Sequence, residues 1–264
     1  MSDLAGDDLA KIESVAMAAA RHVSDFILGS FRTDRLVEGR KADGSLVTQI
    51  DREAERRVRD FIASSPINKW PILGEEFGGS TDGARFRWLI DPVDGTFSYT
   101  RGLPTFGTIV AFEDAAEGRA LAGAIHLPAL DETYVAARGL GARCNGTRIR
   151  VATDRDFSAC LISTADVDQF RRADLESEYR VLRKQVQHLR GYADCWSHCM
   201  VARGAIDAVM EPYMHRWDFA ATEVLVEEAG GRCMTRASKA ARGTYDGVFG
   251  APAAVAELTQ ILGF

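Results

Sequence analysis

The sequence of 264 residues lacks several features that mark common classes of protein. It has no apolar run approaching the roughly 20 residues that cross a bilayer, so no membrane-spanning helix is expected. It has no cluster of lysine and arginine, and its net charge of −6 argues against nucleic acid as a partner. Its first residues, MSDLAGDDLAKIE, are polar and acidic, unlike a secretory signal. We therefore expect a cytoplasmic protein that binds neither nucleic acid nor a membrane.

Paired cysteines are also lacking. The five cysteines are an odd number, are widely scattered and include no Cys-x-x-Cys pair, which argues against a disulfide framework. Cys195, His198 and Cys199 lie close together in the sequence, with His215 further along, and could bind zinc. Without a Cys-x-x-Cys spacing, the better-supported interpretation places these cysteines on the inner face of a helix.

Repeats, low-complexity segments and proline-rich linkers are absent as well, so we expect one rigid unit. Apolar residues at helical spacing predict helices over 9–27 and 51–63, and short apolar runs predict strands at 72–73, 88–90, 108–112, 120–126 and 133–137. Asn145-Gly146 predicts a hairpin turn. Beyond residue 151, the alternating elements expected are strands at 159–163, 188–190, 208–210, 232–235 and 247–249, and helices at 175–187, 195–203, 219–229 and 254–262. We predict an α+β N-terminal lobe, residues 1–150, and an α/β C-terminal lobe, residues 151–264.

What the sequence does have is a set of acidic side chains at the ends of these elements. Glu75, Glu76, Asp91 and Asp94 follow expected strands, and Asp51 and Asp218 stand near helix starts. Taken singly, each has an ordinary explanation as a loop residue or a helix cap. Thr48 and Asp51 could form a capping box, for example, and Asp218 could cap or complement a helix dipole.

The stretch WLIDPVDGTFSY, residues 88–99, is harder to explain as an ordinary loop. Asp91 and Asp94 end an apolar run and therefore lie close to the core, where unpaired carboxylates are costly to keep charged. A hard divalent cation such as Mg²⁺ removes that cost, because it takes oxygen ligands from carboxylates, backbone carbonyls and water. Pro92 fixes the turn between the two carboxylates and lets the carbonyl of Val93 point to the same place.

The next residues, Gly95 and Thr96, offer backbone N–H groups without a bulky side chain at the first position. Such groups can hold an anion at a helix start. Metal ions beside an anion site are typical of enzymes that transfer a phosphoryl group to water. The stretch therefore predicts a metal and phosphate site.

Three motifs, in matching order and spacing, make the sequence similar to the inositol monophosphatase family of magnesium-dependent, lithium-sensitive phosphatases. GEEFG at 74–78 resembles the family's first acidic motif, and WLIDPVDGTFSY resembles its W-[IV]-[IVL]-D-P-[IVL]-D-G-T signature. WDFAATEVLVEEAGG at 217–231 resembles its W-D-x-A-A…E-A-G-G signature. The similarity covers nearly the whole chain. It implies an α/β fold with layers in the order αβαβα, a homodimer, a small-molecule phosphate ester as substrate, and two to three Mg²⁺ ions per active site.

The resemblance also implies the metal ligands. Their expected sets are Glu75, Asp91 and the carbonyl of Val93 for the first ion, Asp91, Asp94 and Asp218 for the second, and Glu75 and Asp51 for a third, weaker ion and its water. Most of these residues lie in the N-terminal lobe, and the C-terminal lobe supplies Asp218, so the two lobes would form one catalytic unit.

The catalytic roles that the resemblance implies fall on Thr96, Glu75 and Asp51. Thr96 and Glu75 would orient a metal-activated water that attacks phosphorus without a covalent phosphoenzyme. The backbone of Gly95 and Thr96 would hold the phosphate, and Lys41 matches a lysine in the loop over the active site.

Two details favour histidinol phosphate over inositol phosphate. Ser98 stands where inositol phosphatases usually have asparagine, and Tyr192-Ala193-Asp194 resembles the YGDCY stretch of bacterial histidinol-phosphate phosphatases, with alanine in place of glycine. A carboxylate at Asp194 would favour a substrate that carries an ammonium and an imidazole. The alternative explanation of Asp194 is a helix N-cap. Glu211 matches the family's substrate-contacting glutamate, and Asp218 would also lie beside the substrate.

Other functions are kept as alternatives. Inositol-1-phosphate or another small monoester would need the same metal site. Fructose 1,6-bisphosphate and 3′-phosphoadenosine phosphates are less favoured, because no basic cluster stands out that would bind a second phosphate. A non-catalytic dimeric scaffold could also keep the metal site, but the presence of every expected ligand and of Thr96 argues against it.

Overall fold

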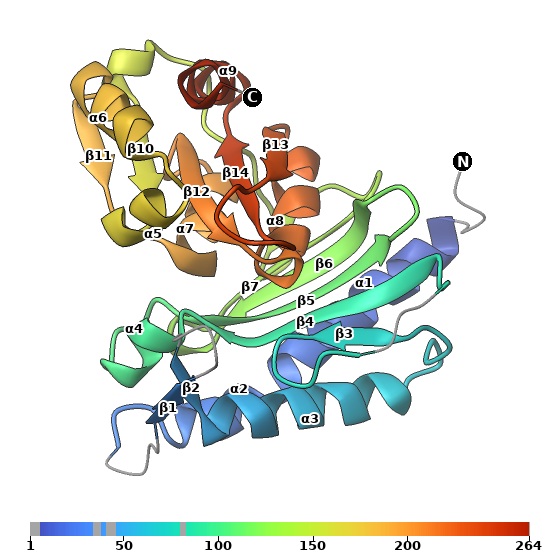
Figure 1. Cartoon of the computed structure of the whole chain (residues 1–264). Helices are drawn as coiled ribbons and strands as arrows, with labels where there is room; N and C mark the ends of the chain where they lie inside the picture. The colour runs from blue at the N-terminus through green and yellow to red at the C-terminus, as the bar shows by residue number, and fades with distance from the viewer. Residues whose placement is uncertain (1–5, 34–37, 41–45, 80–82, 264) are drawn as a thin grey trace.

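The computed structural model describes residues 6–33, 38–40, 46–79 and 83–263, arranged as alternating layers of helix and sheet (Figure 1). Two helices cover the outer face of a seven-stranded sheet, two lie between that sheet and a five-stranded sheet, and three cover the far face of the second sheet. The outer helices are α1 (Gly6–His22) and α3 (Gln49–Ala63), and the middle ones are α7 (Asp194–Ala202) and α8 (Arg216–Glu228). The far face is covered by α5 (Val167–Arg172), α6 (Glu176–Gln185) and α9 (Pro252–Leu262). The αβαβα order that the resemblance implied is confirmed.

The seven-stranded sheet carries the acidic stretch and runs in the order β3-β4-β5-β6-β7-β8-β9. β3 pairs with β4 in parallel, whereas the other pairs are antiparallel. Every residue of β5 is buried, because helices pack on both faces of the sheet. The strands are β3 (Ile72–Gly74), β4 (Phe86–Asp94), β5 (Gly107–Asp114), β6 (Arg119–Leu127), β7 (Glu132–Ala137), β8 (Arg143–Cys144) and β9 (Thr147–Arg148). The predicted Asn145-Gly146 turn joins β8 and β9, with both residues at positive φ.

The five-stranded sheet runs in the order β11-β10-β12-β14-β13. β10 pairs in parallel with both of its neighbours, and β14 pairs antiparallel with both of its neighbours. The strands are β10 (Leu161–Thr164), β11 (His188–Arg190), β12 (Ala208–Met214), β13 (Arg232–Ala237) and β14 (Tyr245–Gly250). The carboxyl ends of β10 and β11 lead into α5 and α7, which places the starts of these helices beside the acidic stretch.

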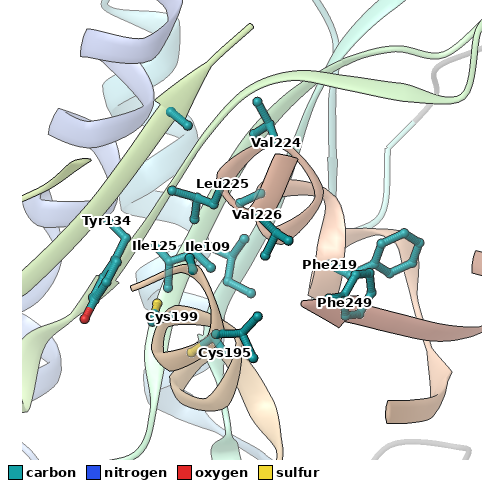
Figure 2. Close-up of a cluster of buried hydrophobic side chains, with 14 of the residues drawn as sticks. Ile109, Ile125, Tyr134, Cys195, Cys199, Phe219, Val224, Leu225, Val226 and Phe249 are labelled. Atoms are coloured by element: carbon teal, nitrogen blue, oxygen red, sulfur yellow. The ribbon is translucent and has the colours of Figure 1, made fainter. Parts of the chain in front are cut away.

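The middle layer forms the core that joins the two sheets. Figure 2 shows apolar side chains of α7 and α8 packed between the strands, among them Cys195, Cys199 and Leu225. Contact is so close that a Cβ on Gly123 of β6 would lie 2.7 Å from the Cα of Ala221. This packing fixes α8, and hence Asp218 in its first turn, against the sheet that carries β4.

Several short elements were not predicted. The expected helix over 9–27 is two helices, α1 and α2 (Ser24–Leu28), with Val23 between them. The unpredicted elements are α4 (Thr96–Thr100), α5, the hairpin of β1 (Glu38–Arg40) and β2 (Leu46–Thr48), and two 3₁₀ turns, η1 (Pro128–Leu130) and η2 (Phe157–Ala159). Among the described residues, no helix is long and apolar enough to cross a membrane. The division into lobes at residue 150 stays a prediction.

Candidate active site

A bulge at the end of β4 explains why two aspartates can stand three residues apart and still face the same cavity. In a regular strand, residues three apart point to opposite faces. The register between β4 and β5 shifts between Asp91 and Asp94, which brings both carboxylates to one side. Pro92 has no N–H to lose at this irregular position, and its carbonyl accepts a hydrogen bond from Thr108 Oγ1 at 2.8 Å.

A third carboxylate reaches the same place from the other half of the chain. Asp218 lies in the first turn of α8, where its Oδ2 accepts a hydrogen bond from the backbone N–H of His215 at 2.7 Å. One carboxylate oxygen from each of Asp91, Asp94 and Asp218 lies within 4.8 Å of the other two. We call these three residues the acidic floor.

Glu75 lies beside the acidic floor because β3 is the parallel neighbour of β4. Its backbone N–H donates to the carbonyl of Ile90 at 3.1 Å, and its side chain hydrogen-bonds to Asp91. The floor and Glu75 line one cavity of about 530 Å³, together with Val93, Gly95, Thr96 and Asp194. Four carboxylates expected from sequence to bind metal therefore meet in one cavity.

The charges of the acidic floor conflict with its burial. Burial raises the pKa of Asp91, and the negative charges of Glu75, Asp94 and Asp218 raise it further. The pKa of Asp218 is raised mainly by burial and then by Asp94 and Glu75. Burial also raises the pKa of Asp94 to about 6, although the backbone N–H of Cys195 donates to its Oδ2 at 2.5 Å. An all-oxygen donor set with crowded negative charge fits a hard divalent cation such as Mg²⁺.

Asp51 has the ordinary capping role considered from sequence, whereas its contact with a third metal ion stays a prediction, because Asp51 is not among the residues that line this cavity. Its Oδ2 accepts hydrogen bonds from the backbone N–H and the hydroxyl of Thr48, at 2.8 and 2.5 Å, so the capping box is confirmed. Its Oδ1 lies 3.1 Å from Thr96 Oγ1, which is also 3.1 Å from the carbonyl of Val93. The cap of α3 therefore also orients the hydroxyl of Thr96.

Gly95 occupies a position that excludes a side chain. Its φ of +81° is a left-handed conformation, and a Cβ there would lie 2.9 Å from the carbonyl oxygen of Thr105 and 3.2 Å from Asp194 Oδ2. The backbone thus turns from β4 into α4 directly in front of Asp194. The predicted phosphate contacts of Gly95 and Thr96 lie at this turn.

Asp194 does not act as the helix cap that the sequence left open. It is the first residue of α7, the preceding residue is Ala193, and no side chain caps this helix. Ala193 has a φ of 44° and Asp194 a φ of 57°, and positive φ is costly for residues that have a Cβ. No described residue forms a hydrogen bond or an ion pair with the Asp194 carboxylate. Burial raises the pKa of Asp194, with further contributions from Asp94 and Glu211.

A second cavity of about 580 Å³ adjoins the first, and Asp194 lines both. Its walls include Ser98 and the exposed side chains of Phe97, Leu103 and Tyr192. The ring of Tyr192 packs edge-on against Trp196 of α7 at 5.2 Å. This space therefore lies next to the acidic floor and carries both apolar and acidic groups.

Two expected substrate-binding residues, Glu211 and Lys41, remain to be located. Glu211 on β12 is buried and accepts a hydrogen bond from His198 Nε2 at 3.0 Å, while His198 Nδ1 pairs with Thr222 Oγ1 at 2.9 Å. Neither cavity includes Glu211 in its lining, so its substrate contact stays a prediction. Lys41 lies outside the described residues.

The residues considered as a zinc site from sequence are core residues instead. Cys195 and Cys199 are buried in the middle layer, as the helix interpretation predicted, and His198 pairs with Glu211. Within the described ranges, the acidic floor is the only group of three or more histidine, cysteine, aspartate or glutamate side chains that could hold a metal ion.

Five further residues that line the first cavity were not predicted from the sequence. Arg40 on β1 lines the first cavity, together with residues at and after the start of α5: Asp166, Asp168, Gln169 and Arg172. Asp166 caps α5 by accepting from the N–H of Asp168 at 2.8 Å. A signal was present, because Asp166 follows a buried strand by two residues, much as Glu75 follows β3 and Asp94 ends β4.

Comparison with known proteins agrees with this geometry. Residues 8–260 match the inositol monophosphatase family. The chain belongs to the inositol monophosphatase family. It is 35% identical over 222 residues to a histidinol-phosphatase of Chlorobaculum parvum, covering 83% of each chain. It is 30% identical over 225 residues to a fructose-1,6-bisphosphatase/inositol-1-monophosphatase of Aquifex aeolicus, covering 84% of this chain and 83% of that one.

The fold is likewise that of the inositol monophosphatase family. The extragenic suppressor protein suhB of Bartonella henselae superposes with a TM-score of 0.83 at 27% identity, over 95% of this chain and 98% of that one. Members of the family use Mg²⁺ and act on phosphate esters. Together with the acidic floor, membership identifies the chain as a metal-dependent phosphomonoesterase.

Proposed function

We propose that this phosphomonoesterase hydrolyses histidinol phosphate to histidinol and phosphate. The observation that carries the proposal is Asp194, a carboxylate without a partner among the described residues, placed where the two cavities meet. An ammonium group of the substrate would satisfy this carboxylate with a charge-assisted hydrogen bond. A neutral polyol would leave it unpaired in a partly dry site, which is costly.

The second cavity suits the rest of such a substrate. Its walls combine the exposed faces of Phe97 and Tyr192, against which a flat imidazole can pack, with the carboxylate of Asp166. The similarity to the histidinol-phosphatase of Chlorobaculum parvum supports the same choice. Glu211 lies close enough to affect the pKa of Asp194, which supports its predicted role near the substrate amine.

The acidic floor and its neighbours would hold two to three Mg²⁺ ions. The proposed donors are Glu75, Asp91, Asp94, Asp218, Asp51 and the carbonyl of Val93. When bound, the ions supply Lewis-acid chemistry: they make a bound water acidic and stabilise charge on the ester oxygen that leaves.

Thr96 would orient the attacking water. Its hydroxyl proton points to Asp51 Oδ1 or to the carbonyl of Val93, both at 3.1 Å, so its oxygen is left to accept a hydrogen bond from water. Thr48 holds Asp51 in turn, which fixes the direction of the Thr96 hydroxyl. The backbone of Gly95 and Thr96 would hold the phosphate, and Lys41, outside the described residues, would also contact it.

Inositol-1-phosphate is the second candidate substrate, and the relative from Aquifex aeolicus supports it. The proposal also includes a homodimer in the cytoplasm, in which both lobes of one chain complete each active site.

The test is a parallel assay of the purified protein on histidinol phosphate, inositol-1-phosphate and fructose 1,6-bisphosphate, with Mg²⁺ and with EDTA. We expect Mg²⁺-dependent phosphate release, with the largest kcat/KM for histidinol phosphate. A larger kcat/KM for inositol-1-phosphate would replace the substrate and keep the metal chemistry. No release from any ester with Mg²⁺ would favour the non-catalytic scaffold. Light scattering tests the dimer separately.

A further inference from the structure

Glu75 lies on a short loop whose shape is held from below by α3. The loop, residues 75–78, begins where β3 ends, and reciprocal backbone hydrogen bonds between Gly74 and Gly78, both 3.0 Å, close it. The loop comprises the last four residues of the GEEFG motif and contains no helix or strand. Its shape therefore depends on contacts from outside.

Glu55 of α3 supplies these contacts. Its Oε2 accepts a hydrogen bond from the backbone N–H of Glu76 at 2.6 Å, and its Oε1 lies 3.4 Å from the N–H of Phe77. The side chain of Glu55 is fully buried, and hydrogen bonds from N–H groups to a charged acceptor are among the stronger ones in proteins. The two residues that follow Glu75 are thus tied to one carboxylate.

Arg59, one helical turn further along α3, completes the arrangement. It forms an ion pair with Glu55 at 2.7 Å and donates to the carbonyl of Gly78 at 2.5 Å. The guanidinium therefore neutralises the buried carboxylate and also holds the far end of the loop. Asp51 lies one turn before Glu55 on the same face of α3, so a single helix face supports both Thr96 and the Glu75 loop.

Gly74 is glycine for a reason that this arrangement explains. Its φ lies outside the left-handed range, so backbone conformation does not require glycine there. A Cβ on Gly74 would lie 2.0 Å from Glu55 Oε1 and 2.4 Å from its Cδ. A side chain at 74 would thus displace the carboxylate from the loop.

We propose that Glu55, neutralised by Arg59, is a positioning residue that shapes the 75–78 loop so that Glu75 reaches the acidic floor. Gly74 is required so that Glu55 can approach the loop. The inference rests on the proposed role of Glu75 as a metal ligand, and it adds residues on α3 and β3 that touch neither metal nor substrate.

The test compares Glu55→Gln and Glu55→Ala with the control Glu53→Gln, which removes a half-buried carboxylate of the same helix that pairs with Arg56 and Arg57. Calorimetry measures Mg²⁺ affinity, and hydrogen exchange measures the amides of Glu76 and Phe77. We expect both Glu55 variants to lose about 10- to 100-fold in Mg²⁺ affinity, as is typical when a residue that orients a metal ligand is changed. Exchange at the two amides should rise roughly tenfold or more, and the control should match wild type.

Gly74→Ala provides an independent arm. Alone, it should weaken Mg²⁺ binding in the same way, because the new Cβ meets Glu55. In the Glu55→Ala background it should add little, because the clashing carboxylate is gone and the end of the Arg59 side chain, 2.8 Å from the same Cβ, is then free to shift. The two changes should therefore not be additive. Additive losses would show that Gly74 acts through something other than Glu55 and would contradict that part of the inference.

Glu75→Gln separates failure of this inference from failure of the proposed ligand set. If Glu75→Gln binds Mg²⁺ as wild type does, the proposed ligand role of Glu75 is wrong. If Glu75→Gln loses affinity but Glu55→Gln keeps it within about twofold, the positioning role is wrong. Glu55→Gln decides even if Glu55→Ala fails to fold, because glutamine keeps the size and one acceptor oxygen while it removes the charge.

Discussion

The acidic floor and the second cavity beside it are built in different ways. On the acidic floor, each carboxylate accepts a backbone N–H: Asp91 from Val93, Asp94 from Cys195 and Asp218 from His215. In the adjoining second cavity, whose lining we call the wall, the Asp194 carboxylate has no hydrogen-bond or ion-pair partner among the described residues, and Phe97 and Tyr192 are exposed. Metal chemistry needs fixed ligands, whereas selection of a leaving group needs side chains that are still available to bind it. The proposed function therefore assigns the chemistry to the floor and the specificity to the wall.

The largest effect is expected when the floor is broken. Asp94→Asn should lower kcat/KM by about a thousandfold or more on every ester, because it removes an anionic donor from the metal site. The fold should survive, since loss of one like charge relieves the crowded floor. Phosphate-release kinetics and thermal unfolding in EDTA measure the two quantities. Activity within about threefold of wild type at saturating Mg²⁺ would contradict the assignment of the floor.

A smaller loss is expected when the water-orienting hydroxyl is removed. Thr96→Ala should lower kcat by about 100-fold with little change in KM, because orientation of the nucleophile matters at the transition state rather than in the bound ground state. Steady-state kinetics with Thr100→Ser, a change in the same short helix, as the control separates the two constants. A raised KM with an unchanged kcat would make Thr96 a binding residue.

The wall should respond selectively. Asp194→Asn should lower kcat/KM for histidinol phosphate roughly ten- to hundredfold, because a charge-assisted hydrogen bond of about 1.5–3 kcal/mol is lost. Glycerol phosphate, which carries no ammonium, should be hydrolysed almost as before. Equal changes for both substrates would return Asp194 to a structural role and remove the distinction between floor and wall.

The smallest effect concerns stability and pH. Burial raises the pKa of Asp94 to about 6 from an ordinary value of 3.8. At pH values between 3.8 and about 6, Asp94 of the folded metal-free protein therefore binds a proton more tightly than Asp94 of the unfolded chain. The stability that this proton provides is lost as pH rises through about 6. Mg²⁺ competes with the proton, so the gain in Tm on adding Mg²⁺ should grow by a few degrees across this range. A gain in Tm that does not change with pH would contradict the link.

The sequence was informative about the floor because its signal is local. Asp91, Pro92 and Asp94 stand in one contiguous stretch, and Asp218 lies in a second signature at a helix start. The bulge that brings the first two carboxylates together depends on pairing with β5 and could not be read from spacing alone.

The wall was harder to predict because its signals are short or conformational. α5 has fewer than two turns, too few for a helical period to appear in the sequence. The positive φ of Ala193 and Asp194 is unusual for residues with a Cβ, so it could not be predicted from the residue types. The role of Glu55 could not be predicted either, since its hydrogen-bond partner Glu76 lies 21 residues away in the sequence.

The most direct test of the division between floor and wall pairs one protein change with one substrate change. Wild type and Asp194→Asn are each assayed on histidinol phosphate and on the analogue that lacks the amino group. We predict that removing the amine costs wild type roughly ten- to hundredfold in kcat/KM and costs Asp194→Asn almost nothing, because the pair has already been broken. If the amine contributes equally to both proteins, Asp194 does not bind it, and the account of the wall is wrong.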